Sequence, residues 1–477
     1  MSSRTTLRAV ALCSVLWTAA AKTQVAHTMH YHQWPLTQGA QLDFTQGAQA
    51  VPVEVPVIWD EPCVVGCDKS TGQLLFAGAD GVYDREGTLL AGTYGEIYCV
   101  AAMPHPGDED LWYLFGYTNV TLSYWVFDRR LRNGLGDMTD VRNVPLLDIP
   151  IDVKLIGLSA DDGSVYRLWA HEPNTDHFKQ FTITAEEGLN PQWTSVPIGA
   201  TIDWKAGYSL PNSASVRPDN RRIALAGRWG EGEDDRIWLV DVDPNAGTVT
   251  NTLEIPLGIE SITGARSAFS PNGQLLYVPT LNCADECGEI RQYDLTQQTP
   301  DAIVGSAHDL YDIVASSPSM YLQLGPDGVI YSTSGADHYY LDHVLRILSP
   351  DEMGWACGWD SVGLMMPVSA IASFAMPWTF WPQVNSTGMA GTGSDTEGLL
   401  IGPNPCSSMT RITWPKEVMQ PTAMRILDAS GRLVASYPLS GSSWAIAVDI
   451  SNLAVGSYTA LLQTSRGVLC APLLIAH

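Results

Sequence analysis

An acidic turn is the first candidate for chemistry in this sequence. Asp241, Asp243 and Asn245 stand at alternate positions of one short run that ends in glycine. Oxygen ligands at alternate positions suit a hard cation such as Ca²⁺. The run departs from an EF-hand loop, because Ala246 replaces the expected glycine and Thr252 replaces the bidentate glutamate. Calcium is the one cofactor that the sequence suggests, and a hairpin turn without any cofactor explains the same residues.

Histidines give two further candidates. His30 and His32 are two positions apart, so their imidazoles share one face of an extended chain and could form a metal pair. They follow the amino-terminal leader closely, and an ordinary pair of surface histidines is the simpler interpretation. A second group lies in one expected loop and could bind a ligand or be solvated polar residues: Asp337, His338, Asp342 and His343.

Recognised catalytic motifs are absent from the sequence. There is no GxSxG nucleophile elbow, no HExxH zinc motif and no GxxxxGK[ST] phosphate loop, and the chain has only six lysines. The sequence therefore assigns no catalytic residue. Active sites assembled from separate repeats leave no local motif, so an enzyme stays open as an alternative.

The elements that must position any site are short strands behind tight turns. Six turns that contain glycine or asparagine each precede a run of apolar, β-branched and aromatic residues, as expected for hairpins. The turns lie at residues 69–72, 106–110, 160–163, 218–220, 271–273 and 326–328. The last four recur at intervals of 57, 53 and 55 residues.

A repeat of about fifty residues with several strands is typical of β-propeller blades. The sequence predicts an all-β fold with a propeller at residues 27–385, of seven blades or alternatively six. Two stacked β-sandwiches would not explain the period. We expect a strand near Leu42 to pair with the end of the repeat region and close the ring. Residues 361–381 are uncharged, and Pro367 and Pro377 within them favour strands of the closing blade over a membrane helix.

Both ends of the chain indicate export. Arg4 and Arg8, an apolar run at 9–17 and alanines at 19–21 predict a signal peptide over residues 1–21. Beyond this leader, eight cysteines remain, and an even number outside the cytosol favours disulfides. The pairs Cys63 with Cys67 and Cys283 with Cys287 could each form a local bridge. Metal binding by these pairs is less favoured, because neither has zinc-ribbon spacing.

The composition changes near the carboxyl end. Residues 386–400 are rich in Gly, Ser and Thr, which predicts a flexible linker. Residues 401–477 alternate apolar and polar positions, with Trp444, Ile446, Val448 and Ile450 on one face and Tyr458, Ala460 and Leu462 in a later strand. This alternation predicts a small Ig-like β-sandwich of about seven strands.

That last segment resembles the type A sorting domain of the type IX secretion system of Bacteroidetes. The motif residues that match are Pro403, Asn404, Pro405, Asp428, Gly431, Leu453, Gly456 and Tyr458. The resemblance implies that the secretion machinery and a sortase-like protease are partners. It also implies passage through the periplasm to the outer-membrane surface or the medium.

The remainder resembles propeller proteins that often carry this tag, including some called gliding-motility-associated. The similar stretches begin at residues 41–44 and continue through 67–87 and 134–143 to 267–280, 290–295 and 322–334. These are strand and turn positions, so the resemblance implies a fold rather than a catalytic site.

Charge narrows the function. The formal net charge is −25, which disfavours nucleic acid as a partner. Residues 401–477 carry five basic and three acidic side chains and the leader carries two arginines, so the remainder carries −29. We expect a secreted or surface-attached propeller that acts as a binding or adhesion module toward a glycan, protein or cation. The alternative is a secreted enzyme, such as a hydrolase, lyase or metal-dependent lactonase, with its active site at the channel mouth.

Overall fold

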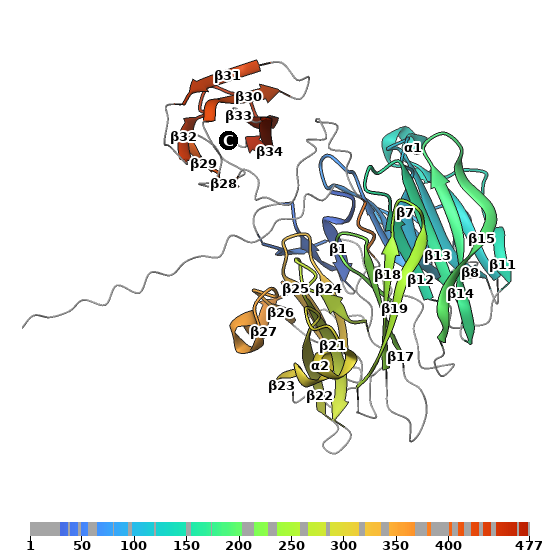
Figure 1. Ribbon diagram of the computed structural model, residues 1–477. Helices are drawn as coiled ribbons and strands as arrows, with labels where there is room; N and C mark the ends of the chain where they lie inside the picture. The colour runs from blue at the N-terminus through green and yellow to red at the C-terminus, as the bar shows by residue number, and fades with distance from the viewer. Residues whose placement is uncertain are drawn as a thin grey trace, which may run out of the picture. The chain divides into compact units, whose positions relative to one another are not determined.

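The computed structural model divides the chain into two compact units, residues 1–385 and 386–477 (Figure 1). The structure describes residues 29–36, 39–45, 49–55, 64–79, 81–93, 98–118, 121–148, 154–172, 174–202, 214–227, 236–257, 266–282, 287–313, 320–334, 343–367, 379–382, 400–402, 409–414, 421–428, 433–439, 445–464 and 467–475. The predicted signal peptide and nearly all of the predicted linker lie outside these residues.

The first unit contains seven antiparallel sheets, which we number as blades 1 to 7. Blade 1 consists of β1 (Gln33–Leu36), β2 (Ala40–Asp43) and β3 (Val51–Glu54). Blade 2 consists of β4 (Val64–Cys67), β5 (Leu74–Ala79) and β6 (Gly81–Asp84). Blade 3 consists of β7 (Tyr98–Pro104), β8 (Leu111–Thr118), β9 (Thr121–Asp128), β10 (Asp137–Met138) and β11 (Val144–Asp148). Blade 4 consists of β12 (Lys154–Ser159), β13 (Val165–His171), β14 (Thr175–Thr184) and β15 (Gly188–Ile202).

The remaining three blades each have four strands. Blade 5 consists of β16 (Ser215–Val216), β17 (Arg222–Gly227), β18 (Arg236–Asp243) and β19 (Thr248–Pro256). Blade 6 consists of β20 (Ala268–Phe269), β21 (Leu275–Asn282), β22 (Cys287–Asp294) and β23 (His308–Ile313). Blade 7 consists of β24 (Met320–Leu324), β25 (Ile330–Ser334), β26 (His343–Ile347) and β27 (Trp359–Met365). Short helices occur as η1 (Met29–Tyr31), α1 (Leu131–Gly134), α2 (Pro300–Gly305) and η2 (Gly354–Cys357).

Each predicted turn joins the first and second strands of one blade. In blade 6, Gly273 has φ of +69°, and a side chain there would meet Arg217 of blade 5. In blade 5, Asn220 takes the same left-handed conformation at φ of +60°, which asparagine tolerates better than most residues. The sequence interpretation of these turns is confirmed.

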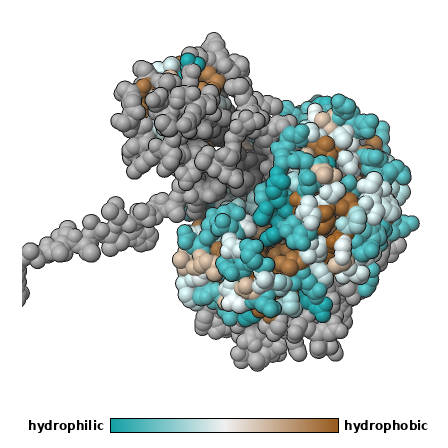
Figure 2. All heavy atoms as spheres, in the orientation of Figure 1, coloured by the Kyte–Doolittle hydropathy of each residue, from teal (hydrophilic) through white to brown (hydrophobic). Residues whose placement is uncertain are grey.

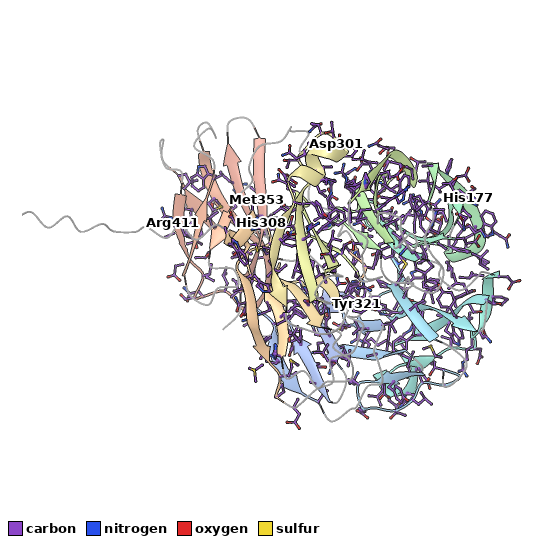
Figure 3. The ribbon with its side chains drawn as sticks, turned by 90° about the horizontal axis from the view of Figure 1, so that it is seen from below. His177, Asp301, His308, Tyr321, Met353 and Arg411 are labelled. Carbon is purple, nitrogen blue, oxygen red and sulfur yellow. The ribbon has the colours of Figure 1, made fainter. Side chains whose placement is uncertain are left out.

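The first strands of the blades follow one another around a ring. Contacts run in chain order between β1, β4, β7, β12, β16, β20 and β24, and the sheets circle the axis when seen from below (Figure 3). The ring closes where Trp34 and Phe44 of blade 1 meet Tyr331 of blade 7, with ring centroids 5.8 and 5.6 Å apart. Seven sheets around a closed ring define a β-propeller.

The predicted mode of ring closure is wrong. The strand that contains Leu42 pairs with β1 and β3 of its own blade, so in the described residues no backbone pairing joins blade 1 to blade 7. Side chains close the ring instead. The Ala50 amide donates to Asp327 Oδ2 at 3.1 Å, and the Tyr331 hydroxyl donates to the same oxygen at 2.6 Å.

Neighbouring blades are also joined by a recurring contact that we call the blade latch. A side chain near the start of the second strand reaches a later turn of the next blade. Tyr277 donates to Pro350 O at 2.7 Å, and Arg167 donates to Pro244 O and Asn245 O at 2.6 and 2.8 Å. Because each latch satisfies carbonyl groups of the neighbouring blade, it fixes one blade against the next.

The second unit is a sandwich of seven strands. They form two sheets with the orders β28-β29-β32 and β31-β30-β33-β34: β28 (Leu400–Gly402), β29 (Met409–Thr413), β30 (Pro421–Asp428), β31 (Leu433–Pro438), β32 (Ala445–Asp449), β33 (Gly456–Thr464) and β34 (Gly467–Ile475). Val448, Ile450, Ala460 and Leu462 are fully buried between the sheets, as their alternation predicts. Trp444 lies outside the described residues.

One predicted disulfide is contradicted. Cys67 ends β4 and is a fully buried free thiol that packs in the propeller core, so a bridge to Cys63 is not formed. Its partner in that prediction lies outside the described residues, as does Cys283 of the other pair. Cys357 is likewise a buried free thiol.

Candidate functional site

The central channel is the place where a propeller can assemble a site from several blades. A cavity of about 30 Å³ lies at four of the inner strands, β12, β16, β20 and β24. Arg266 is the one ionisable side chain among the lining residues, and it is 4% exposed and donates a hydrogen bond to Gln323. A space of this size holds ordered water, and it is far smaller than pockets for small molecules.

The chain itself fills this part of the channel. Residues 379–382, which we call the strap, follow blade 7 and reach across the ring. Gln323 of blade 7 donates to Thr379 Oγ1 at 2.6 Å, and Asn220 of blade 5 donates to Trp381 O at 3.0 Å. Phe380 packs edge-on against Tyr166 of blade 4 with ring centroids 4.9 Å apart. The strap therefore joins three blades, and Thr379 and Trp381 form part of the cavity lining.

The strap also resolves the uncharged segment noted in the sequence. Residues 361–365 belong to β27, the fourth strand of blade 7, whereas residues 379–381 form the buried strap. The expectation of closing-blade strands is confirmed for residues 361–365, and residues 368–378 lie outside the described residues. None of the helices in the described ranges has the length and apolar content that a membrane crossing requires.

The acidic turn of blade 5 is bound to protein groups. Arg222 holds Asp241 at 2.5 and 3.0 Å, and the amides of the turn donate to Asp243 Oδ1. The Asn245 side chain donates to Asp161 Oδ2 of blade 4 at 2.7 Å. The three predicted calcium ligands thus face different partners. Within the described residues, no group of three or more His, Cys, Asp or Glu side chains could hold a metal ion.

The first histidine pair is not on the surface, contrary to the simpler interpretation. His30 is 5% exposed in η1, and its ring packs edge-on against Trp112. Burial lowers the pKa of His30 to about 3 and that of His32 to about 4. His343 begins β26, while Asp337, His338 and Asp342 lie outside the described residues.

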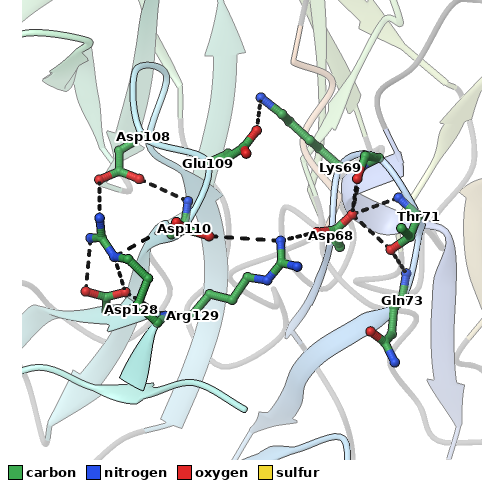
Figure 4. A network of polar contacts seen from close by, with 11 residues as sticks. Asp68, Lys69, Thr71, Gln73, Asp108, Glu109, Asp110, Asp128 and Arg129 are labelled. Atoms are coloured by element: carbon green, nitrogen blue, oxygen red, sulfur yellow. Dashed lines mark hydrogen bonds and ion pairs between the residues drawn. The ribbon is translucent and has the colours of Figure 1, made fainter. Parts of the chain in front are cut away.

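A charged network joins blades 2 and 3 (Figure 4). Asp68, at the end of β4, pairs with Arg129 and accepts hydrogen bonds from Ser70 and Thr71. Burial raises the pKa of Asp68, but these hydrogen bonds outweigh it and hold the pKa well below its usual range. Lys69 pairs with Glu109 at 2.5 Å. The carboxylates are matched by cations of the adjoining blade, so this network is structural.

Sequence reasoning missed two kinds of residue. Lys154 is fully buried at the start of β12 and pairs in register with His171 of β13; burial lowers the pKa of His171 to about 3. A lysine inside an apolar run was the available signal. Met353 and Trp355 are large apolar side chains that are exposed instead of buried, at 44% and 57%. Their exposure has no sequence signal, because it depends on the turn that holds them.

The sorting-domain motif residues lie at structural positions of the sandwich. Asp428, the last residue of β30, is the register partner of Tyr458 near the start of β33, which Gly456 begins. The Tyr458 hydroxyl donates to Ala454 O at 2.9 Å, and Leu453 packs against the sandwich core. Pro403, Asn404, Pro405 and Gly431 lie outside the described residues.

Comparison with known proteins identifies this second unit. Residues 401–475 match the family described as the secretion system C-terminal sorting domain. The chain therefore carries a type IX secretion signal that directs it to the cell surface or the extracellular space. No curated protein matches the chain.

Solved structures similar to the chain share little sequence with it. Hydrazine synthase of Kuenenia stuttgartiensis is 12% identical with a TM-score of 0.35, and the match covers 69% of this chain and 79% of that one. A quinonprotein alcohol dehydrogenase-like protein of Bacteroides thetaiotaomicron is 11% identical with a TM-score of 0.36, covering 68% and 73%. The extracellular domain of a putative one-component system from the same organism is 11% identical with a TM-score of 0.35, covering 93% and 56%. Similarity at this level carries no argument about function.

Proposed function

We propose that the exported propeller is a binding or adhesion module that acts at the cell surface or in the medium. The observation that supports it most is the strap. Phe380 and Trp381 are 1% and 6% exposed, and Trp381 lines the small cavity at the inner strands of blades 4 to 7, so the chain's own side chains narrow the space there. Recognition then falls to the outer surface of the blades, where loops and turns on a rigid frame commonly carry binding residues.

The rigidity of the frame is a second support for this proposal. The blade latches and the closure at Asp327 hold each blade at a fixed place in the ring. A surface that is ordered before its partner arrives avoids part of the entropic cost of association. The face of the described residues seen in Figure 2 is largely hydrophilic with separate apolar patches, as expected for an exported protein with local contact sites.

The enzyme remains the second candidate, and one observation favours it. Lys154 and His171 are both fully buried and lie together at the end of the inner strand away from the strap. Buried ionisable groups are concentrated at functional sites. The segments that adjoin them, residues 149–153 and 203–213, lie outside the described residues.

Incubation with candidate ligands separates the two functions. The purified full chain is mixed with panels of glycans and peptides, and both retention and chemical change are measured by mass spectrometry. A binding module retains a ligand class saturably and leaves it unaltered. Covalent change of the ligand that depends on protein concentration, and that stops in Lys154→Met, would instead establish the enzyme.

A further inference from the structure

The turn between β26 and β27 presents two large apolar side chains to solvent. Met353 is 44% exposed and Trp355 is 57% exposed, the highest value among the described aromatic residues. We call these two residues the aromatic patch. Figure 3 labels Met353 together with His308, which lies beneath the turn. Tryptophan is among the residue types most enriched in binding hot spots, so an exposed indole on an ordered turn is a candidate contact site.

Buried side chains of blade 6 hold this turn in place. Gln292 is fully buried, and it donates to Glu352 O at 2.8 Å and accepts from the Gly354 amide at 2.7 Å. Tyr277, also fully buried, donates to Pro350 O at 2.7 Å. The backbone on both sides of Met353 is thereby tied to the core of the next blade. The patch is exposed because the fold holds it outward.

Gly354 allows the two side chains to share one surface. Its φ is +59°, a left-handed conformation that glycine adopts without strain. A Cβ at this position would lie 3.2 Å from His308 Nε2. The His308 ring supports the Trp355 indole edge-on, with centroids 6.0 Å apart and an interplanar angle of 85°. Trp355 stays 57% exposed beside this contact, so much of the indole remains open to a partner.

The charge around the patch is negative. Glu352 is exposed directly beside Met353, and Asp309, next to His308, is 54% exposed. Arg291 on the adjoining strand pairs with Asp309 at 2.5 Å, so these two charges cancel and Glu352 supplies the negative charge beside the patch. An exposed indole beside a carboxylate attracts a cation to its face, and the net charge of −25 brings basic partners toward this protein.

At another exposed tryptophan, a cation of the same chain already lies over the indole ring. Trp193 of β15 is 42% exposed, and Lys179 Nζ lies 5.3 Å from its ring centroid. Lys179 is in turn paired with Glu172 at 2.5 Å. Indole, cation and carboxylate are thus all supplied by blade 4 itself. Among the described residues no cation takes the corresponding place over Trp355.

We propose that the aromatic patch binds a basic segment of another protein, with an arginine or lysine stacked on Trp355 and its charge facing Glu352. This inference rests on the proposed binding function and names its partner chemistry. Tryptophan and arginine dominate binding hot spots, and they do so most when the receptor is already ordered. The turn held by Gln292 meets that condition.

The test measures binding of the full chain to an immobilised ten-residue peptide of alternating arginine and glycine. We expect binding that weakens with salt and is lost when citrulline replaces arginine. Trp355→Ala should weaken it about tenfold, and Glu352→Gln should weaken it less. Trp193→Ala is the matched control and should change it less than twofold. All three positions are solvent-exposed, and thermal melting verifies that each variant folds.

Several outcomes would overturn the inference. The first is that Trp355→Ala binds the arginine peptide as well as the wild type does. The second is that the wild type binds the citrulline peptide as well as the arginine peptide. The third is that Trp355→Ala loses binding to a neutral glycan but keeps binding to the basic peptide. Binding of labelled chain to whole cells is measured in parallel. If the wild type and Trp355→Ala both bind cells equally, the inference fails and the binding function stands. If the wild type binds neither cells nor peptide, both fail.

Discussion

At the scale of single residues, buried and half-buried polar side chains fix how the blades join. Arg167, Asn220, Gln292 and Asp327 each lie at a junction between blades and join groups that are distant in the sequence. Their types could be read from the sequence, but their partners could not, because each partner comes from a different repeat. The sequence of the acidic turn suggested a cation ligand set, whereas the contact of Asn245 with Asp161 of blade 4 is visible only in the fold.

Replacement of Arg167 tests the latch. Arg167→Met removes two hydrogen bonds and leaves Pro244 O and Asn245 O without these donors, so we expect a loss of about 2 kcal/mol in the free energy of unfolding. Arg221→Met is the control, since its pair with Asp161 is nearly half exposed on both sides and is worth less than about 1 kcal/mol. Urea denaturation measures both. Equal effects would contradict the latch.

The acidic turn gives a second test at this scale. Arg222, Asn251 and the turn amides already satisfy Asp241 and Asp243, so we expect the same melting temperature with added calcium and with a chelator. A rise in melting temperature with calcium that is lost in Asp243→Ala would instead show that a cation binds at this turn.

Buried histidines make stability depend on pH. His30 and His32 have folded-state pKa values of about 3 and about 4, below the unfolded value of 6.5. Below pH 6.5 the unfolded chain therefore binds more protons, and stability falls as the pH drops from 6.5 toward 4. Each histidine costs about 2 kcal/mol at pH 5. His32→Gln should flatten the slope of unfolding free energy against pH by roughly 1.4 kcal/mol per unit; an unchanged slope would contradict this.

At the scale of elements, the hairpins were predictable and the closure was not. The turns at Gly273 and Asn220 were identified because their left-handed backbone selects glycine or asparagine. The strands of the sandwich were identified because Val448 and Ile450 alternate with exposed residues. Ring closure by Tyr331 and the strap around Trp381 have no periodic signal, since each occurs once and depends on contacts between distant segments.

The strap provides the element-scale prediction. Trp381 is 6% exposed and packs with apolar residues of blades 6 and 7. We expect Trp381→Ala to lower the free energy of unfolding by about 3 to 5 kcal/mol, as for other buried tryptophans. Trp193→Ala, at an exposed position, should change it by less than about 1 kcal/mol. If the two variants melt alike, the strap does not stabilise the ring.

At the scale of the whole molecule, the chain combines a sorting domain with an acidic ring. The sorting domain at residues 401–475 could be identified from ordered motifs alone, and the family comparison agrees. The function of the ring could not be identified in this way, because contacts between blades, such as that of Arg266 with Gln323, form only in the fold. The negative charge lies in the ring and its flanking segments, which carry −29, whereas the sorting domain and the leader each carry +2. This distribution favours basic or neutral partners for the ring.

Deletion of residues 401–477 tests the role of the sorting domain. We expect the shortened chain to remain in the periplasm, while the full chain reaches the surface or the medium. Quantitative proteomics of fractionated cells measures both. The control is a full chain with Trp193→Ala, which should be exported normally. Export of the shortened chain at the normal level would contradict the assignment.

Binding to whole cells tests the central claim most directly. Fluorescently labelled full chain is titrated onto cells, and the bound fraction is measured against concentration, with heat-unfolded chain as the control. The proposed binding function predicts saturable and reversible binding that requires the folded chain. Binding that rises without saturation, or equally for folded and unfolded chain, would contradict it.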